Sequence, residues 1–102
     1  MRNIRLGFKQ NFGSAIARIY PNPFVERFTI DFYNSNPADD ISVAIYDFAG
    51  KQVYSQHTGH LPLGNTSVKI SLASKQLNAG VYMATINKNG LRFKTVKFVK
   101  RK

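Results

Sequence analysis

The sequence contains no cysteine, and this absence excludes several classes of protein. Disulfide frameworks, thiol catalysis and cysteine-ligated zinc or iron–sulfur sites all require that residue. No apolar run approaches the roughly 18 residues that a membrane-spanning helix needs. The first residues do not form a signal peptide, because Arg2, Arg5 and Lys9 interrupt any apolar stretch. Either a secretory signal lies on a longer parent chain, or the protein stays in the cytoplasm.

Acidic residues are also scarce, since 5 Asp and Glu stand against 15 Lys and Arg and leave a formal net charge of +10. All five acidic residues lie between positions 26 and 47, and the last fifteen residues contain none. A basic end favours phosphate-bearing partners such as nucleic acid, lipopolysaccharide or an anionic surface. A lysine-rich edge strand that only discourages aggregation between sheets explains the same pattern. The charge pattern leaves both interpretations open.

The apolar content is sufficient for one folded domain. The chain has 102 residues, of which 43% are hydrophobic, and it includes 8 Phe and 5 Tyr. Disordered chains have fewer aromatic residues, and chains of this length hold a single core. Residues 1–16 are polar and basic and include Gly7 and Gly13, so we expect a flexible linker or processing region there. The domain itself is expected over residues 17–102.

From residue 17 onward, apolar and polar residues alternate with a period of two, and no helical stripe exceeds one turn. Pro21 and Pro23 cannot donate hydrogen bonds to a strand ladder, which places the first strand at a sheet edge. The number and spacing of strands are typical of an all-β sandwich or barrel. The predicted strands cover residues 17–20, 27–33, 41–47, 51–56, 68–72, 81–87 and 91–99.

The last predicted strand contains a break in its alternation. Leu91 and Phe93 share one parity, whereas Val96 and Phe98 share the other. If both pairs face the core, one extra residue near residues 94–95 must shift the phase of the strand, as a β-bulge does.

Two local motifs predict specific turns. Asp47 begins a hairpin loop in which its side chain bonds the backbone two residues on, and Gly50 takes a left-handed conformation. The sequence from Leu77 to Tyr82 has the form Leu-x-x-Gly-x-Tyr, with Gly80 in its centre. In Greek-key sandwiches a tyrosine at this place bonds the backbone of the preceding corner, although an ordinary core tyrosine after a turn glycine is the alternative.

Residues with catalytic or metal-binding chemistry are few. His57 and His60 lie three residues apart, but they fall in a predicted loop with no acid close in sequence, so we expect two solvated histidines. No phosphate-binding loop and no nucleophile elbow is present. We expect no enzyme activity, no metal and no cofactor.

Most aromatic residues on the predicted strands are expected in the core, because a small sandwich needs large side chains to fill it. If the aromatic residues were instead exposed beside the lysines, the sequence would favour a basic module that binds nucleic acid or carbohydrate. Burial of Phe28, Phe32 and Tyr82 would count against both alternatives, and we regard nucleic acid as an unlikely partner.

Several segments, read in order, are similar to one family. They are the Tyr-Pro-Asn-Pro sequence at residues 20–23, the Asp-x-x-Gly-Lys turn, the Leu-x-x-Gly-x-Tyr motif and a final Lys-x-x-Lys at residues 97–100. Together they resemble the type A C-terminal sorting domain of the type IX secretion system (the Por secretion tail), over about residues 17–100. The signature residues are Pro21, Asn22, Pro23, Asp47, Gly50, Lys51, Leu77, Gly80 and Tyr82.

The resemblance implies an immunoglobulin-like, Greek-key antiparallel β-sandwich that serves as an address rather than as a catalyst. Its implied partners are an N-terminal cargo domain on a parent chain, an outer-membrane translocon and a sortase-like cysteine peptidase. That peptidase removes the domain and joins the cargo to an anionic lipopolysaccharide. The implied destination is the cell surface, reached through the periplasm with a signal peptide on the parent protein.

We expect the recognition surface at Lys94, Lys97, Val99 and Lys100, and we assign the signature residues mainly to the scaffold. At these four positions an edge strand would offer unpaired backbone groups for strand addition and cations for an acidic groove. Two basic residues, at 101 and 102, extend beyond the Lys-x-x-Lys motif, at which family members often stop. Because the sequence opens without cargo or signal peptide, we expect a fragment or an excised domain.

Overall fold

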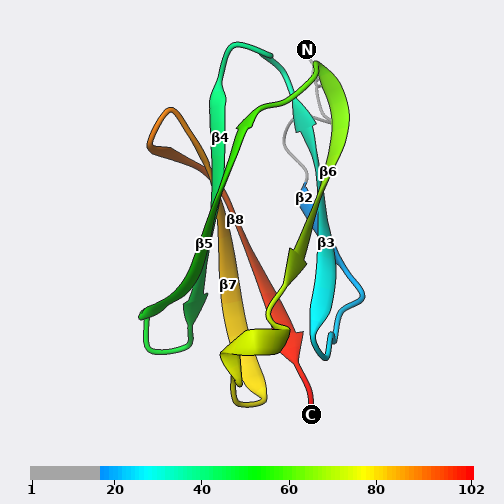
Figure 1. Cartoon of the computed structure of the whole chain (residues 1–102), viewed down its shortest axis with the longest axis vertical. Coiled ribbons are helices and arrows are strands. Elements are labelled where there is room, and N and C mark those ends of the chain that lie inside the picture. The colour runs from blue at the N-terminus through cyan, green and yellow to red at the C-terminus, as the bar shows by residue number, and fades with distance from the viewer. Residues whose placement is uncertain (1–16) are drawn as a thin grey trace, which may run out of the picture.

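Two antiparallel sheets packed face to face make up the computed structural model, which describes residues 17–102 (Figure 1). The three-stranded sheet has the order β2 (Ala17–Tyr20), β3 (Arg27–Asn34), β6 (Gly64–Ser71). The four-stranded sheet has the order β5 (Gln52–His60), β4 (Asp40–Asp47), β7 (Gly80–Lys88), β8 (Leu91–Lys100). A short 3-10 helix, η2 (Ala73–Lys75), lies between β6 and β7. The expected immunoglobulin-like all-β sandwich is confirmed, whereas the linker expected over residues 1–16 lies outside the described part.

The period-two pattern places the core between the sheets, as β3 illustrates. Phe28, Ile30 and Phe32 are buried there, and the intervening Thr29 and Asp31 face away from the core. Burying each large apolar side chain contributes about 1.5–3 kcal/mol, so such a strand is held mainly by its inner face. The buried apolar residues are Ile19, Phe24, Phe28, Ile30, Phe32, Ile41, Val43, Ala44, Ile45, Val68, Ile70, Leu72, Tyr82, Ala84, Ile86 and Phe98.

All seven predicted strands are present, but one predicted loop is wrong. The segment expected as a connection over residues 57–65 is mostly strand, because β5 continues to His60 and β6 begins at Gly64. β5 is an edge strand, and its pairing with β4 continues past a register shift. The backbone hydrogen bonds of this pairing keep the polar residues of β5 extended, although their sequence does not alternate between apolar and polar residues. Ladder pairing therefore overrides the turn signals of this segment.

The expected bulge in β8 is confirmed, one residue before its predicted place, but Leu91, which was expected to face the core, is 74% exposed. Ile86 pairs with Lys94 and Asn87 pairs with Arg92, which leaves Phe93 without a partner on β7. After this extra residue, Val96 packs against the core and Phe98 is buried within it.

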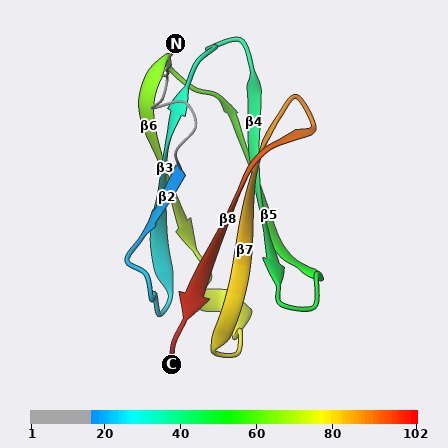
Figure 2. The same cartoon turned by 180° about the vertical axis from the view of Figure 1, so that it is seen from behind.

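β2 lies at a sheet edge, as its flanking prolines predict, and it runs beside β8 of the other sheet. The view from behind shows β8 crossing towards β2 before it reaches the C-terminus (Figure 2). In the part of the chain that the structure describes, no helix is long and apolar enough to cross a membrane.

Candidate functional site

The segments that carry the sequence resemblance meet at one end of the sandwich, drawn at the bottom of Figure 1. The turn after β4 and the segment leading into β7 line one hollow of about 310 Å³ there, between Phe48 and Tyr82. A second hollow, of about 160 Å³, brings Val25 beside Lys100 and Leu77. We call this the lower end, formed by residues 21–26, 47–51, 72–82 and 97–102.

The Asp47 turn forms as its sequence predicts. The Asp47 carboxylate accepts hydrogen bonds from the backbone N–H of Ala49 at 3.0 Å and of Lys51 at 2.9 Å. The N–H of Gly50 donates to the Asp47 carbonyl at 3.0 Å, and Gly50 has a φ of +89°, which an L side chain rarely adopts. The signature residues Asp47, Gly50 and Lys51 therefore fix the shape of the hairpin.

Tyr82 makes the predicted corner. Its hydroxyl donates to the backbone carbonyl of Asn78 at 2.6 Å, while its ring lies in the core, 6.3 Å from that of Phe98. Burial, and secondarily the negative charge of Asp47, raise the pKa of Tyr82 above its ordinary value of 10.0. Leu77 packs against the core from the same segment, and Gly80 has a φ of +151°. These contacts and the backbone of Gly80 shape the segment that leads into β7.

The Tyr-Pro-Asn-Pro segment closes the end of β8. The N–H of Phe24 donates to the Val99 carbonyl at 3.0 Å, and the N–H of Arg101 donates to the Phe24 carbonyl at 2.9 Å. The side chain of Asn22 accepts the Val99 N–H at 3.0 Å, so it takes the place of a backbone carbonyl. We call residues 22–24 and 99–101, joined in this way, the terminal clamp.

The terminal clamp corrects one expectation about the end of β8. The outward backbone groups of Val99 were expected to be free for strand addition, but Asn22 and Phe24 occupy them. In an antiparallel ladder, alternate residues point their N–H and C=O groups away from the partner strand. Thr95 and Lys97 therefore share the outward direction of Val99, and nothing between residues 17 and 102 bonds their backbone on that side. The outward backbone groups left unbonded within the described chain lie at residues 95–97, although β2 runs beside this strand.

The four expected recognition residues do not lie on one face. Lys97 and Val99, opposite Met83 and Val81, point away from the core and are exposed. Lys94 and Lys100 have the parity of the buried Phe98, lie on the inner side of the strand and are half-buried. The structure therefore places two of these residues on each side of β8.

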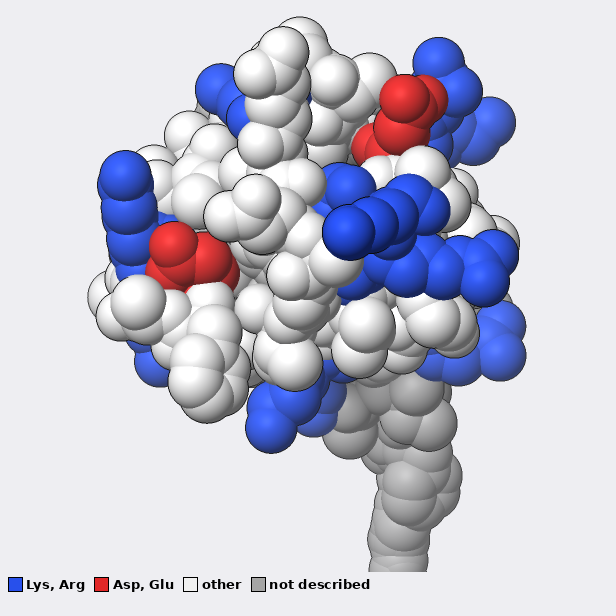
Figure 3. Space-filling model, turned by 90° about the horizontal axis from the view of Figure 1, so that it is seen from below, with Lys and Arg blue, Asp and Glu red and all other residues white. Residues whose placement is uncertain are grey.

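Basic side chains gather on one side of the lower end and occur at several points around its rim, with acidic atoms in small separate areas (Figure 3). Within residues 17–102, the Lys and Arg side chains that pair with an acid are Arg18, 4.0 Å from Asp31, and Lys88, 3.8 Å from Asp39. The basic residues of β8 form no ion pair with any described acid, so their charge is available to a partner.

Comparison with known proteins agrees with this geometry. Residues 18–101 match the family described as "Secretion system C-terminal sorting domain". The chain belongs to this family. Membership makes it a sorting signal of type IX secretion, a system that delivers proteins to the cell surface or the extracellular space. No curated protein matches the sequence.

The sorting domain also resembles a solved structure, "Pseudomonas fluorescens alkylpurine DNA glycosylase AlkC bound to DNA containing an abasic site analog". The TM-score is 0.56 at 15% sequence identity, and the match covers 85% of this chain. The chain corresponds to only 29% of that protein's length, and the likeness shows the fold alone.

Both histidines of the sorting domain are exposed, as expected, but they lie on β5 rather than in a loop, and each contacts an acidic residue that is distant in sequence. His57 Nε2 lies 2.7 Å from a carboxylate oxygen of Asp40, and His60 Nδ1 lies 3.1 Å from the Asp39 carbonyl. The paired strands β4 and β5 bring these residues together, although they are far apart in sequence. Among the described residues, no three His, Cys, Asp or Glu side chains are grouped so that they could hold a metal ion.

The aromatic residues bear out the expected core. Phe28, Phe32 and Tyr82 are all at most 5% exposed, which counts against their use as a binding platform. Sequence reasoning missed Phe24, which is fully buried against the rings of Phe28 and Phe98. Phe24 follows Pro23 in an irregular loop, so no strand periodicity marked it as a core residue.

Proposed function

We propose that residues 17–102 act as a C-terminal address that directs an attached N-terminal cargo across the outer membrane to the cell surface. In this proposal an outer-membrane translocon recognises the folded domain, and a sortase-like cysteine peptidase cuts upstream of β2. The match to the sorting-domain family over residues 18–101 is the observation that supports it.

We place the recognition surface on β8, at Lys94, Lys97, Val99 and Lys100. A partner lying flat on the sheet would contact only Lys97 and Val99, because the other two side chains are on the opposite side of the strand. A partner strand that adds to the edge contacts side chains of both sides. The alternating positions therefore favour recognition from the edge.

The open stretch at residues 95–97 supports the same choice. Its outward backbone groups are available within the described chain, and the neighbouring cations have no acidic partner there. Backbone pairing would supply affinity, and an acidic partner would supply selectivity and a faster encounter.

Two variants test the two components. Thr95→Pro removes an N–H that points away from β7, so the ladder with β7 stays intact while strand addition is blocked. Lys94→Glu with Lys97→Glu reverses two charges of β8. The matched control, Lys69→Glu with Lys75→Glu, makes the same charge change on β6 and η2. Each domain is fused to a reporter with a signal peptide and expressed in a host that has the secretion system.

We expect both β8 variants to leave the reporter in the periplasm, and the control to deliver it to the surface. Melting curves of the purified domains verify that all variants are folded. Surface delivery by the folded Thr95→Pro variant would disprove strand addition, and delivery by the double Glu variant would disprove an acidic groove. If the unsubstituted fusion itself stayed in the periplasm, the sorting function would be wrong.

A further inference from the structure

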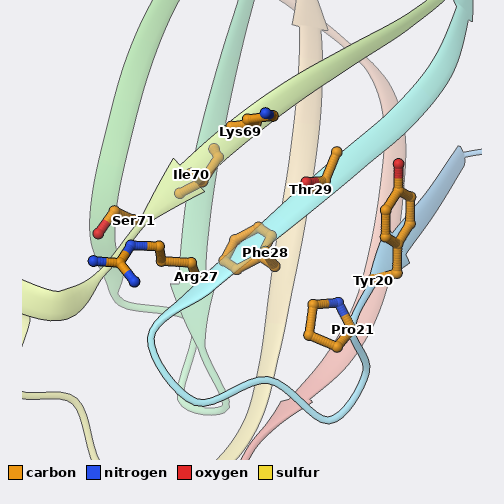
Figure 4. A pocket seen from close by; sticks show the side chains of 8 residues that line it. All are labelled: Tyr20, Pro21, Arg27, Phe28, Thr29, Lys69, Ile70 and Ser71. Carbon is orange, nitrogen blue, oxygen red and sulfur yellow. The ribbon is translucent and has the colours of Figure 1, made fainter.

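The outer face of the three-stranded sheet contains a hollow of about 340 Å³ that lies outside the recognition surface proposed on β8. Figure 4 shows Tyr20 and Pro21 at one side of it and Arg27 and Ser71 at the other, with Thr29 between them. Its volume is within the range of pockets that bind small ligands.

The sequence explains why the face is hollow at this place. Thr29 is a short side chain in a row with two long ones, since it pairs with Tyr20 on β2 and Lys69 on β6. In the next row Arg27 pairs with Ser71, but β2 has already ended at Tyr20, where Pro21 turns the chain away. The missing neighbour leaves open space beside Arg27.

Two cations border this space. Arg27 and Lys69 are exposed, and neither pairs with any acid among residues 17–102. A guanidinium binds a carboxylate or phosphate through two parallel hydrogen bonds, and an ammonium adds a point charge. The hydroxyl groups of Thr29 and Ser71 lie beside them as further hydrogen-bonding groups.

The opposite wall is apolar and is held in place. Tyr20 is 44% exposed, and its hydroxyl donates to Asp31 at 3.0 Å. Asp31 in turn accepts from Ser67 at 2.5 Å and lies near Arg18, so its charge is locally compensated. The hydrogen bond to Asp31 is the main cause that raises the pKa of Tyr20 above its ordinary value. Tyr20 therefore presents a fixed ring face beside the cations.

A second hollow of about 400 Å³ continues along the same face. Tyr33 and Asn65, paired across β3 and β6, line it together with Ser67. Aromatic, hydroxyl and amide groups thus follow one another over two adjoining hollows.

We propose that the outer face of the β2–β3–β6 sheet binds an acidic sugar, with its carboxylate or phosphate between Arg27 and Lys69 and one ring against Tyr20. A sugar ring has an apolar C–H face, which an aromatic ring covers, and a rim of hydroxyls, which side-chain hydroxyls and amides bond. A bare anion would use the cations and leave the Tyr20 wall without a contact. This binding site is separate from the β8 edge and goes beyond the sorting function.

Four probes separate the components of the proposed ligand. Digalacturonate carries carboxylates on a sugar, mannose 6-phosphate carries a phosphate, maltose carries no charge, and tetraglutamate carries carboxylates without a sugar. Each is titrated into the 15N-labelled full chain, and the backbone amide shifts locate the site. We expect the shifts of the acidic sugars to centre on residues 20, 27–33 and 65–71, with maltose and tetraglutamate at least about tenfold weaker. The stronger of the two acidic sugars identifies the charged group.

Matched variants test the residues. Arg27→Ser with Lys69→Ser should weaken the acidic sugar about tenfold, whereas Arg92→Ser with Lys97→Ser, the same charge loss on β8, should leave binding within about twofold. Tyr20→Phe should keep binding and Tyr20→Ala should lose it, with melting curves to verify folding. Equal binding of tetraglutamate, shifts centred on β8, or equal losses in the two double variants would each overturn the proposal.

Discussion

The backbone N–H of Phe24 donates to the carbonyl of Val99 at 3.0 Å, which joins the start of the domain to its last strand. Phe24 is also fully buried, with its ring 4.9 Å from that of Phe28 and 5.2 Å from that of Phe98. The hydrogen bonds of the terminal clamp therefore hold a core residue in place, and the C-terminal residues contribute to folding.

The terminal clamp predicts a graded effect of truncation. Removing residues 101–102 loses one bond of the clamp, from the Arg101 N–H to Phe24, and an exposed bond from the Lys100 ammonium to the Arg101 carbonyl. This truncation should lower the free energy of unfolding by about 1 kcal/mol. Removing residues 99–102 loses all three bonds of the clamp and should cost about 2–4 kcal/mol. Urea unfolding of the two truncated chains measures both values. Equal small losses would show that the clamp does not stabilise the domain.

The fold was predictable because its determinants are local. Alternating apolar residues specify each strand, and the Asp47 turn and the Tyr82 corner need only residues within five positions of each other. The break in parity between Phe93 and Val96 even predicted a bulge, although the structure places it at Phe93.

The site was less predictable because it depends on distant pairing. Asn22 and Val99 are 77 positions apart, and nothing in either segment indicates that they bond. The sequence therefore predicted β8 as the basic edge but missed that its end is closed. The bonded pair of Tyr20 and Asp31, which borders the hollow on the outer face, was missed for the same reason. Tyr20 stands before a proline, so the alternation of the strand did not indicate that its side chain points outward.

Gly80 should tolerate no side chain, because of its backbone conformation and not because of a clash with neighbouring atoms. Its φ is +151°, yet a Cβ built there would meet no atom within 4 Å. Gly80→Ala and Gly80→Val should therefore both destabilise the domain, by about 1–3 kcal/mol, with the β-branched residue worse. Urea melts measure the loss. A neutral Gly80→Ala variant would show that the backbone relaxes to an ordinary strand conformation.

Tyr82 should make stability fall at alkaline pH. Because burial raises its pKa above 10.0 in the folded chain, the folded state binds the proton more tightly than the unfolded state. This contribution is complete below pH 10.0 and is lost as the pH rises through the folded pKa. Tyr82→Phe should cost about 1 kcal/mol at neutral pH through the lost bond to Asn78.

The measured quantity is the difference in the free energy of unfolding between the two proteins, and it should shrink as the pH rises above 10.0. Every other tyrosine, including Tyr20 with its own raised pKa, is present in both chains and cancels in that difference. A constant difference across the range would contradict a raised pKa at Tyr82.

Asp47 has two roles, and one substitution separates them. Asp47→Asn keeps a side-chain oxygen that accepts from the N–H groups of Ala49 and Lys51, but it removes the negative charge. The turn should remain, with a change of less than about 0.5 kcal/mol at neutral pH, whereas Asp47→Ala should lose about 1–2 kcal/mol.

Because the charge of Asp47 is the smaller of two causes, Asp47→Asn should lower the pKa of Tyr82 without returning it to 10.0. An NMR titration of 13C-labelled tyrosine measures this pKa in each variant. An unchanged value in Asp47→Asn would show that burial alone sets the pKa and that the turn is electrostatically independent of the corner.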